Sequence, residues 1–196
     1  MVERQSPLTP IFRPAVHSND VGSISITLSE VTPLSIVEAA CWPGLNERLT
    51  AAIQEVTGLS VDTTPNAGVV GRGTAAFSIG PDRYLVSGEE DLSARLARVL
   101  SEETGTVTDL SHGRTTFRVS GTRAEWVLSK LFAIDFSPAV FPVGEGRATA
   151  HHDIFAQIQR SDAAQFDLYV FRSFARAFWN TLCTAAEEVG YEVIEA

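Results

Sequence analysis

Residue types that form a hydrolytic triad stand close together in the segment Asp109-Leu-Ser-His112. Asp109 and Ser111 are two residues apart, so in an extended strand their side chains point to one face and that of His112 to the other. In a triad the histidine lies between the nucleophile and the acid. The chain also lacks a GxSxG motif. This spacing disfavours nucleophilic catalysis.

Metal and phosphate sites are disfavoured in the same way. His151 and His152 are adjacent in a predicted strand, where neighbouring side chains face opposite ways, and no HExxH motif accompanies them. Cys41 and Cys183 form no CxxC pair, and two buried thiols are the expectation over a disulfide. The segment Gly71-Arg72-Gly73 lacks the Walker lysine, so a turn is expected there.

Two arginines begin the last predicted helix, which runs from about residue 174 to 189. Ser173 is a suitable N-cap, and Arg172 and Arg176 are four residues apart, so they share one face. Such a pair can bind a carboxylate of a partner or a ligand. It can equally form salt bridges within the chain. Both alternatives remain open from the sequence.

Length and charge restrict the class of protein. The chain has 196 residues, a net charge of −9 and 44% hydrophobic residues, an ordinary globular composition. An acidic chain without a basic stripe is an improbable nucleic-acid binder. No apolar run reaches the roughly 18–20 residues that a membrane helix needs. Without an apolar signal segment near the start, the expected location is the cytoplasm.

The elements around the first motif are the clearest in the chain. Thr106–His112 and Arg114–Ser120 read as consecutive strands, the second with period-2 alternation. From Ala124 the period becomes helical, since the apolar residues fall at i, i+3, i+4 and i+7. The same order of strand, strand and helix occurs earlier, where Gly44 precedes a helix as Gly121 does.

The sequence therefore predicts an α+β fold with two similar halves, residues 23–105 and 106–196, each running strand, strand, helix, strands, helix. Glu89, Glu90 and Asp91 are expected to open the second helix of the first half. Residues 1–22 carry three prolines and are expected to be an arm that is extended over another surface or disordered.

Several motifs occur together in one order and spacing: Asp109–Arg114, Val119–Ala124, Ile134–Phe136, Phe141–Gly144, Phe166–Val170 and Arg172–Arg176, with Ser6-Pro7-Leu8 near the start. Together they resemble the gamma subunit of heterotetrameric sarcosine oxidase. The resemblance is clearest over residues 106–190 and is thinner over 20–105.

The resemblance implies a subunit of a complex that oxidatively demethylates sarcosine to glycine, with formation of 5,10-methylenetetrahydrofolate and hydrogen peroxide. It implies that FAD, FMN, NAD and tetrahydrofolate reside in the alpha and beta subunits, that alpha is the direct contact, and that a delta subunit completes the complex. It also implies a fold similar to the folate-binding domain of aminomethyltransferases.

On this reading the chain is a non-catalytic small subunit with no catalytic, cofactor or metal residues of its own. The candidates for interface or structural roles are Asp109, His112, Arg114, Arg172 and Arg176. The alternatives are a stand-alone folate-binding protein, in which Asp109 or Asp135 would face an aromatic wall, and the small subunit of a related N-methyl amino acid oxidase or dehydrogenase.

Overall fold

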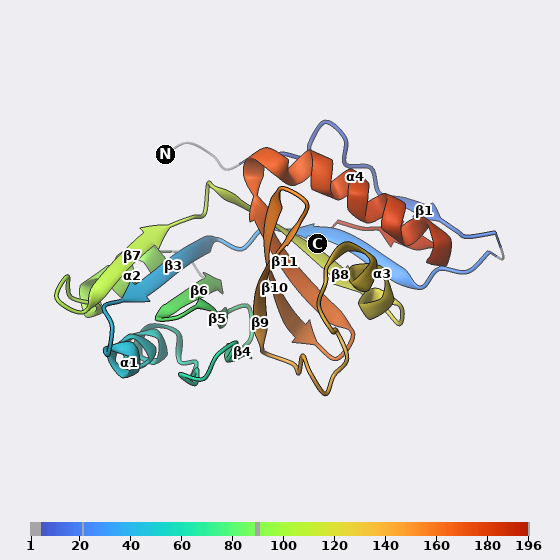
Figure 1. Cartoon of the computed structure of the whole chain (residues 1–196). Helices are drawn as coiled ribbons and strands as arrows, with labels where there is room; N and C mark the ends of the chain where they lie inside the picture. The colour runs from blue at the N-terminus through green and yellow to red at the C-terminus, as the bar shows by residue number, and fades with distance from the viewer. Residues whose placement is uncertain (1–4, 21, 89–90, 196) are drawn as a thin grey trace. The chain divides into compact units, whose positions relative to one another are not determined.

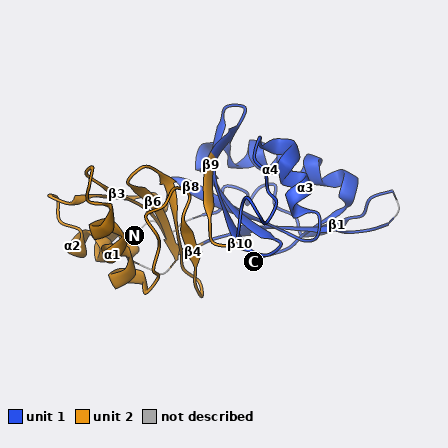
Figure 2. Ribbon diagram, turned by 60° about the horizontal axis from the view of Figure 1, so that its bottom comes forward, with its two compact units in different colours: residues 1–32, 113–142, 149–196 blue, residues 33–112, 143–148 orange. Residues whose placement is uncertain are grey.

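The computed structural model describes residues 5–20, 22–88 and 91–195. It divides the chain into two compact units (Figure 2). Unit 1 holds residues 1–32, 113–142 and 149–196, and unit 2 holds residues 33–112 and 143–148. Among these described residues, each unit combines one β-sheet with two α-helices, which confirms the predicted α+β class.

Unit 2 is built on a five-stranded sheet with the order β4-β5-β6-β3-β7. The helices α1 and α2 pack on β3 (Figure 1). They cover an apolar core that includes Val37, Leu49, Val86 and Leu96. In chain order its elements are β3 Ser35–Cys41, α1 Asn46–Thr57, β4 Gly68–Val70, β5 Ala75–Gly80, β6 Arg83–Gly88, α2 Leu92–Val99 and β7 Gly105–Asp109.

Unit 1 is built on a seven-stranded sheet with the order β1-β12-β2-β8-β11-β10-β9. The helices α3 and α4 pack on each other, and their buried residues join one core with those of the sheet (Figure 1). The elements of this sheet and its helices are β1 Ala15–His17, β2 Ile26–Val31, β8 Arg114–Ser120, α3 Ala124–Leu131, β9 Gly146–His151, β10 Ile154–Asp162, β11 Gln165–Phe171, the 3-10 helix η1 Arg172–Phe174, α4 Ala175–Ala186, η2 Glu187–Val189 and β12 Tyr191–Val193. The first three residues of β9 fall within unit 2.

The internal repeat is visible in the sheet orders. The series β7-β3-β6-β5-β4 in one sheet corresponds to β2-β8-β11-β10-β9 in the other, and each repeat runs β-β-α-β-β-β-α along the chain. The helices that follow Gly44 and Gly121 are equivalent, and both glycines have positive φ, 84° and 125°. The element order read from the sequence thus describes the repeat.

The predicted halves, 23–105 and 106–196, are nevertheless not the compact units of the structure. The first strand of each repeat pairs in the other repeat's sheet: β2 is antiparallel to β8, and β7 is antiparallel to β3. The hydrophobic period identifies a strand, but the backbone groups that form ladders are the same in every strand. The period therefore did not reveal this exchange of strands.

Within residues 5–20, the N-terminal arm, expected to be extended over another surface or disordered, forms a turn and the short strand β1, which pack on unit 1. The carbonyl of Leu8 accepts hydrogen bonds from the amides of Ile11 and Phe12, each at 2.7 Å, and the Leu8 side chain is fully buried in the unit 1 core. Further along, β1 pairs with β12. Burying a leucine contributes roughly 2 kcal/mol, which offsets the ordering of the short turn. Residues 1–4 and 21 lie outside the described ranges.

The starts of two helices differ from the sequence reading. Glu89 and Glu90 lie outside the described residues, and Asp91 precedes α2 with a positive φ of 60°. Ser173 is not the N-cap of α4, since it lies within η1 and α4 begins at Ala175 without a side-chain cap. The 3-10 turn supplies the first backbone hydrogen bond instead, from the amide of Ala175 to the carbonyl of Arg172.

Candidate functional site

The turn after β7 uses its polar groups to hold itself together. A carboxylate oxygen of Asp109 accepts a hydrogen bond from the amide of Ser111 at 2.8 Å. The hydroxyl of Ser111 is buried and accepts from the amide of Ile36 at 3.0 Å. His112 is exposed. Asp109 and Ser111 thus have local structural roles, and the serine is not arranged as a nucleophile.

Arg114 begins β8 and is buried. Its guanidinium lies 3.8 Å from the centroid of the Phe171 ring, and the two residues are paired across β8 and β11. Next to this pair, the amide of Arg172 donates to the carbonyl of Gly113 at 3.0 Å. A guanidinium over an aromatic face contributes about 1 kcal/mol or more when it is desolvated. The structure therefore brings Arg114 and Arg172 to one end of β11.

The arginine pair at the start of α4 contacts the N-terminal arm. Arg172 donates through Nη2 to the carbonyl of Gln5, and Arg176 donates through Nε to the carbonyl of Pro7 at 2.9 Å. Ser6, on the same turn, hydrogen bonds to the carboxylate of Glu30 on β2. The sequence predicted that Arg172 and Arg176 bind a carboxylate, either of a partner or ligand or within the chain. The contacts found here are with backbone carbonyls, which orient the guanidinium groups and leave their charge unbalanced.

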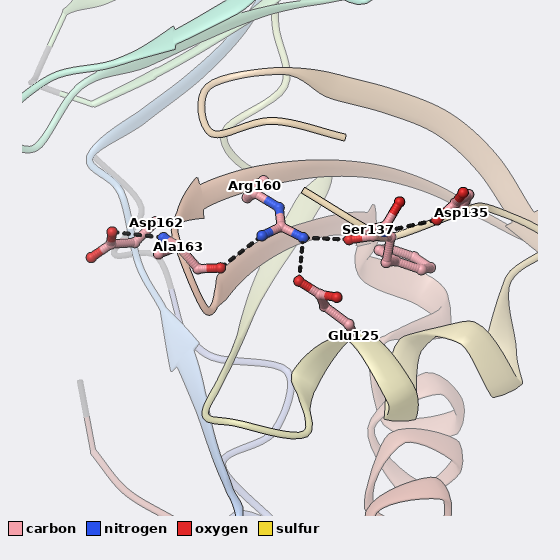
Figure 3. Close-up of polar contacts among 7 residues, drawn as sticks. Glu125, Asp135, Ser137, Arg160, Asp162 and Ala163 are labelled. Carbon is pink, nitrogen blue, oxygen red and sulfur yellow. Dashed lines mark hydrogen bonds and ion pairs between the residues drawn. The ribbon is translucent and has the colours of Figure 1, made fainter. Parts of the chain in front are cut away.

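A buried arginine of unit 1 that was not predicted from the sequence holds several elements together (Figure 3). Arg160 on β10 is 1% exposed and forms an ion pair of 2.6 Å with Glu125 of α3. It also donates to the carbonyls of Ala163, at 2.7 Å, and Phe136. These contacts join a strand, a helix and the loop after α3.

The sequence did contain a signal for Arg160. In β10 the alternate residues Ala156 and Ile158 are fully buried in the core, so the same period places Arg160 on the core side. A charged residue at a core position of an alternating strand requires a partner. Its guanidinium also lies 4.6 Å from the centroid of the Phe166 ring. The role is structural, since it connects elements of one unit.

Asp135, a carboxylate considered for the folate alternative, lines a hollow together with Trp126. The side chain of Ser137 and then its amide, at 2.8 Å, hydrogen bond to the carboxylate of Asp135, and these two contacts lower the pKa of that carboxyl. The Trp126 ring is already occupied by cations, with Lys130 Nζ at 4.0 Å and the Arg123 guanidinium at 4.9 Å from its centroid. An aromatic ring and a carboxylate therefore line the same hollow. The indole ring, however, already contacts the side chains of Lys130 and Arg123.

The two cysteines are free thiols, in agreement with the sequence reading. Burial raises the pKa of Cys41, and burial raises that of Cys183 to about 11, so both are protonated at neutral pH. His151 is half-buried with Nδ1 2.8 Å from the carbonyl of Leu131, and His152 lies in the turn beside it. Within the described ranges, no three potential metal-ligating side chains gather at one place.

In the described part of the chain, no helix combines the length and the apolar character that crossing a membrane requires.

The candidate interface and structural residues lie in two places. Asp109 ends β7 and His112 lies in the turn after it. Arg114, Arg172 and Arg176 lie around the end of β11 and the start of α4. The second group is the candidate interface.

The chain is similar to known proteins over nearly its whole length. It is 28% identical over 193 residues to the sarcosine oxidase subunit gamma of Corynebacterium sp. (strain P-1), covering 97% of this chain and 94% of the relative. It is 30% identical over 148 residues to the subunit gamma of an Arthrobacter species, covering 74% of this chain and 71% of the relative.

Solved structures extend the comparison to the fold. A chain of the heterotetrameric sarcosine oxidase from Corynebacterium sp. U-96, in complex with pyrrole 2-carboxylate, matches with a TM-score of 0.78 and 26% identity, covering 95% of this chain and 96% of that one. Aminomethyltransferase T of the glycine cleavage system from Bartonella henselae matches with a TM-score of 0.66 and 12% identity, covering 98% and 60%. The second match confirms the predicted aminomethyltransferase-like fold. The profile of the sarcosine oxidase gamma subunit family matches residues 44–188, and the chain belongs to this family.

Proposed function

We propose that this chain is the gamma subunit of a heterotetrameric sarcosine oxidase in the cytoplasm and serves in assembly. The observation that carries the proposal is the match to a chain of such an enzyme over 95% of this chain and 96% of that one. Agreement across both units supports the same overall role, because a chain that shared only one unit could have acquired a different partner surface.

The reaction, in this proposal, belongs to the other subunits. FAD, FMN, NAD and tetrahydrofolate are assigned to the alpha and beta subunits, alpha is the direct contact, and delta completes the complex. Three groups of this chain support the assignment: the hydroxyl of Ser111 is engaged with backbone, and the thiols of Cys41 and Cys183 have raised pKa values. The proposed substrate is sarcosine, and another N-methyl amino acid is the alternative.

Co-expression with candidate alpha, beta and delta subunits, followed by capture on a tagged copy of this chain, tests the proposal. Co-purification of yellow flavoprotein subunits with sarcosine-dependent peroxide formation is the expected result. Other N-methyl amino acids in the same peroxide assay determine the substrate. A stable, colourless chain that captures none of the three subunits would contradict the proposal.

A titration of the isolated chain with tetrahydrofolate separates the stand-alone folate-binding alternative. We expect no saturable change in Trp126 fluorescence, because Lys130 and Arg123 already contact the indole ring. A Trp126→Phe variant serves as the control for the origin of the signal. Saturable quenching that disappears in this variant would favour folate binding.

The candidate Arg114 gives a further prediction. Arg114→Ala removes the guanidinium from the Phe171 ring, so we expect weaker folding or assembly but unchanged flavin chemistry in the complex that does assemble. Peroxide formation per mole of bound flavin measures the chemistry, and the yield of complex measures assembly. Normal yield and normal stability of this variant would count against the role.

A further inference from the structure

A hollow of about 690 Å³ lies between the N-terminal arm and the start of α4. It is lined by Arg172, Ser173 and Arg176 on one side and by arm residues 5–7, 9 and 10 on the other. The side chains that line it carry two positive charges and no negative charge. In a chain with a net charge of −9 this is a locally cationic site.

The arginine forks are held in position without being neutralised. The hydrogen bonds of Arg172 and Arg176 to the carbonyls of Gln5 and Pro7 use one nitrogen of each guanidinium. A guanidinium has five N–H donors, so donors remain on both. Among residues 5–20, 22–88 and 91–195, no carboxylate forms an ion pair with either one. A pre-oriented fork binds a carboxylate with a smaller loss of side-chain entropy.

Exposed aromatic side chains adjoin the arginines in the chain. Phe171 and Phe174 are 38% and 39% exposed, although large apolar side chains are usually buried. Phe155 on β10 is equally exposed, and its ring centroid lies 6.3 Å from that of Phe171. Arginine and aromatic residues together are the groups enriched in protein–protein interfaces. A small free anion would use the arginines and leave the phenylalanines in water.

We propose that this arginine–phenylalanine surface, formed by Phe171, Arg172, Phe174 and Arg176, docks an acidic segment of another subunit. A carboxylate of that segment accepts hydrogen bonds from both guanidinium groups, and apolar side chains beside it pack on the phenylalanine rings. The inference rests on the proposed function, because it assumes that the chain assembles with other subunits. It adds the surface used and the chemistry of the partner.

The test measures binding of the tagged chain to the co-expressed alpha, beta and delta subunits at low and high salt. The variant Arg172→Gln/Arg176→Gln removes both charges but keeps amide donors for the arm carbonyls. Its matched control, Arg48→Gln/Arg98→Gln, removes two exposed charges from α1 and α2 of unit 2. We expect the dissociation constant to rise at least about tenfold for the first variant, with a weaker dependence on salt, and to stay unchanged for the control.

A third variant, Phe174→Ala, is needed because the substitution of both arginines can also release the arm from α4. It leaves the contacts of Arg172 and Arg176 with the arm in place and should also raise the dissociation constant by about tenfold. Thermal unfolding of each isolated variant shows whether the arm remains docked. If the arginine variant unfolds earlier than the wild type, Phe174→Ala alone decides the question.

The outcomes separate this inference from the proposed function. If the wild-type chain captures none of the subunits, the proposed function fails. If it captures them, and Arg172→Gln/Arg176→Gln and Phe174→Ala both bind as tightly as the wild type, the docking surface is wrong. Self-association of the wild-type chain that both variants abolish would assign the surface to a second copy and would also overturn the inference.

Discussion

Units 1 and 2 share the same order of strands and helices, but the side chains in their cores differ. The core cluster of unit 2 that contains Leu49 and Leu96 is aliphatic apart from Tyr84 among the described residues, and Phe77 is buried outside this cluster. The unit 1 core holds two groups of contacting rings, one with Phe117, Phe178 and Trp179 and the other with Phe136, Phe141 and Phe166. It also holds the buried Arg160, and it is extended by the arm, β1 and β12.

The difference shows which features of a repeat are free to diverge. The pairing order of the strands is common to both sheets, since each position depends on backbone hydrogen bonds that any side chain permits. Core side chains need only fill the available volume at native density. Unit 1 could therefore hold larger aromatic side chains, the buried Arg160 and the N-terminal arm without a change of topology.

The largest effect on this comparison should come from Arg160→Ala. It removes the ion pair with Glu125 and the donors to the carbonyls of Ala163 and Phe136, and it leaves a cavity in the unit 1 core. We expect a loss of about 4 kcal/mol in the free energy of unfolding, measured by urea denaturation. Glu125→Gln, at a site that is 40% exposed, should cost less than about 1 kcal/mol. Equal costs for the two variants would contradict the central role of Arg160.

The substitution Leu8→Ala tests whether the N-terminal arm belongs to the unit 1 core. Leu8 is fully buried in the unit 1 core, so the shortened side chain should cost about 3 kcal/mol in the free energy of unfolding. Ile11→Ala, in the same turn but 37% exposed, is the matched control and should cost less than about 1 kcal/mol. If Leu8→Ala is as mild as its control in thermal and urea unfolding, the arm does not belong to the core.

A smaller effect on the free energy of unfolding is expected from two ion pairs in equivalent positions. One joins β8 and β11 of unit 1, and the other joins β3 and β6 of unit 2. Arg118 binds both carboxylate oxygens of Asp167, at 2.7 and 2.9 Å, with side-chain exposures of 34% and 9%. Arg83 binds one oxygen of Glu38, with exposures of 51% and 20%. Arg118→Ala leaves Asp167 buried without this partner and should cost about 2 kcal/mol. Arg83→Ala should cost at most about 0.5 kcal/mol.

Double-mutant cycles measure the same contrast without the contribution of the lost side chains. The coupling energy of Arg118 with Asp167 should exceed that of Arg83 with Glu38, and only the latter should vanish in 1 M salt because water and ions reach it. Equal coupling in both units would show that burial does not distinguish the two pairs.

The smallest effect on stability at neutral pH should come from the thiols. The pKa of Cys183 is raised from 9.0 to about 11, chiefly by burial. Between these values the unfolded chain releases the proton while the folded chain retains it, so stability is fully present below pH 9 and falls as the pH rises toward 11. Cys183→Ser should flatten this fall.

Thiol labelling provides an independent measurement of the same shift. With iodoacetamide at pH 8, Cys183 in the folded chain should react on the order of 100-fold more slowly than in the unfolded chain, since the thiolate is the nucleophile. Cys41 in unit 2, whose pKa is also raised by burial, should be slow as well. Rapid labelling of Cys183 in the folded chain would contradict its protonated state.

The sequence by itself determined the elements and the family. Period-2 alternation identified β8, the change of period identified α3, and the glycines before the two equivalent helices revealed the repeat. These signals are local, because each depends on residues within one turn or one strand. The motifs between residues 106 and 190 pointed to the gamma subunit family, and the family profile confirms it.

Only the tertiary structure decided which strands pair and what the charged residues contact. The exchange of β2 and β7 between sheets, the buried position of Leu8 and the carbonyl contacts of Arg172 and Arg176 all join residues that are far apart in the chain. Backbone hydrogen bonds carry no residue-specific signal, and a guanidinium accepts a carboxylate, a carbonyl or an aromatic face as its partner. The choice among such partners depends on which elements the fold brings together.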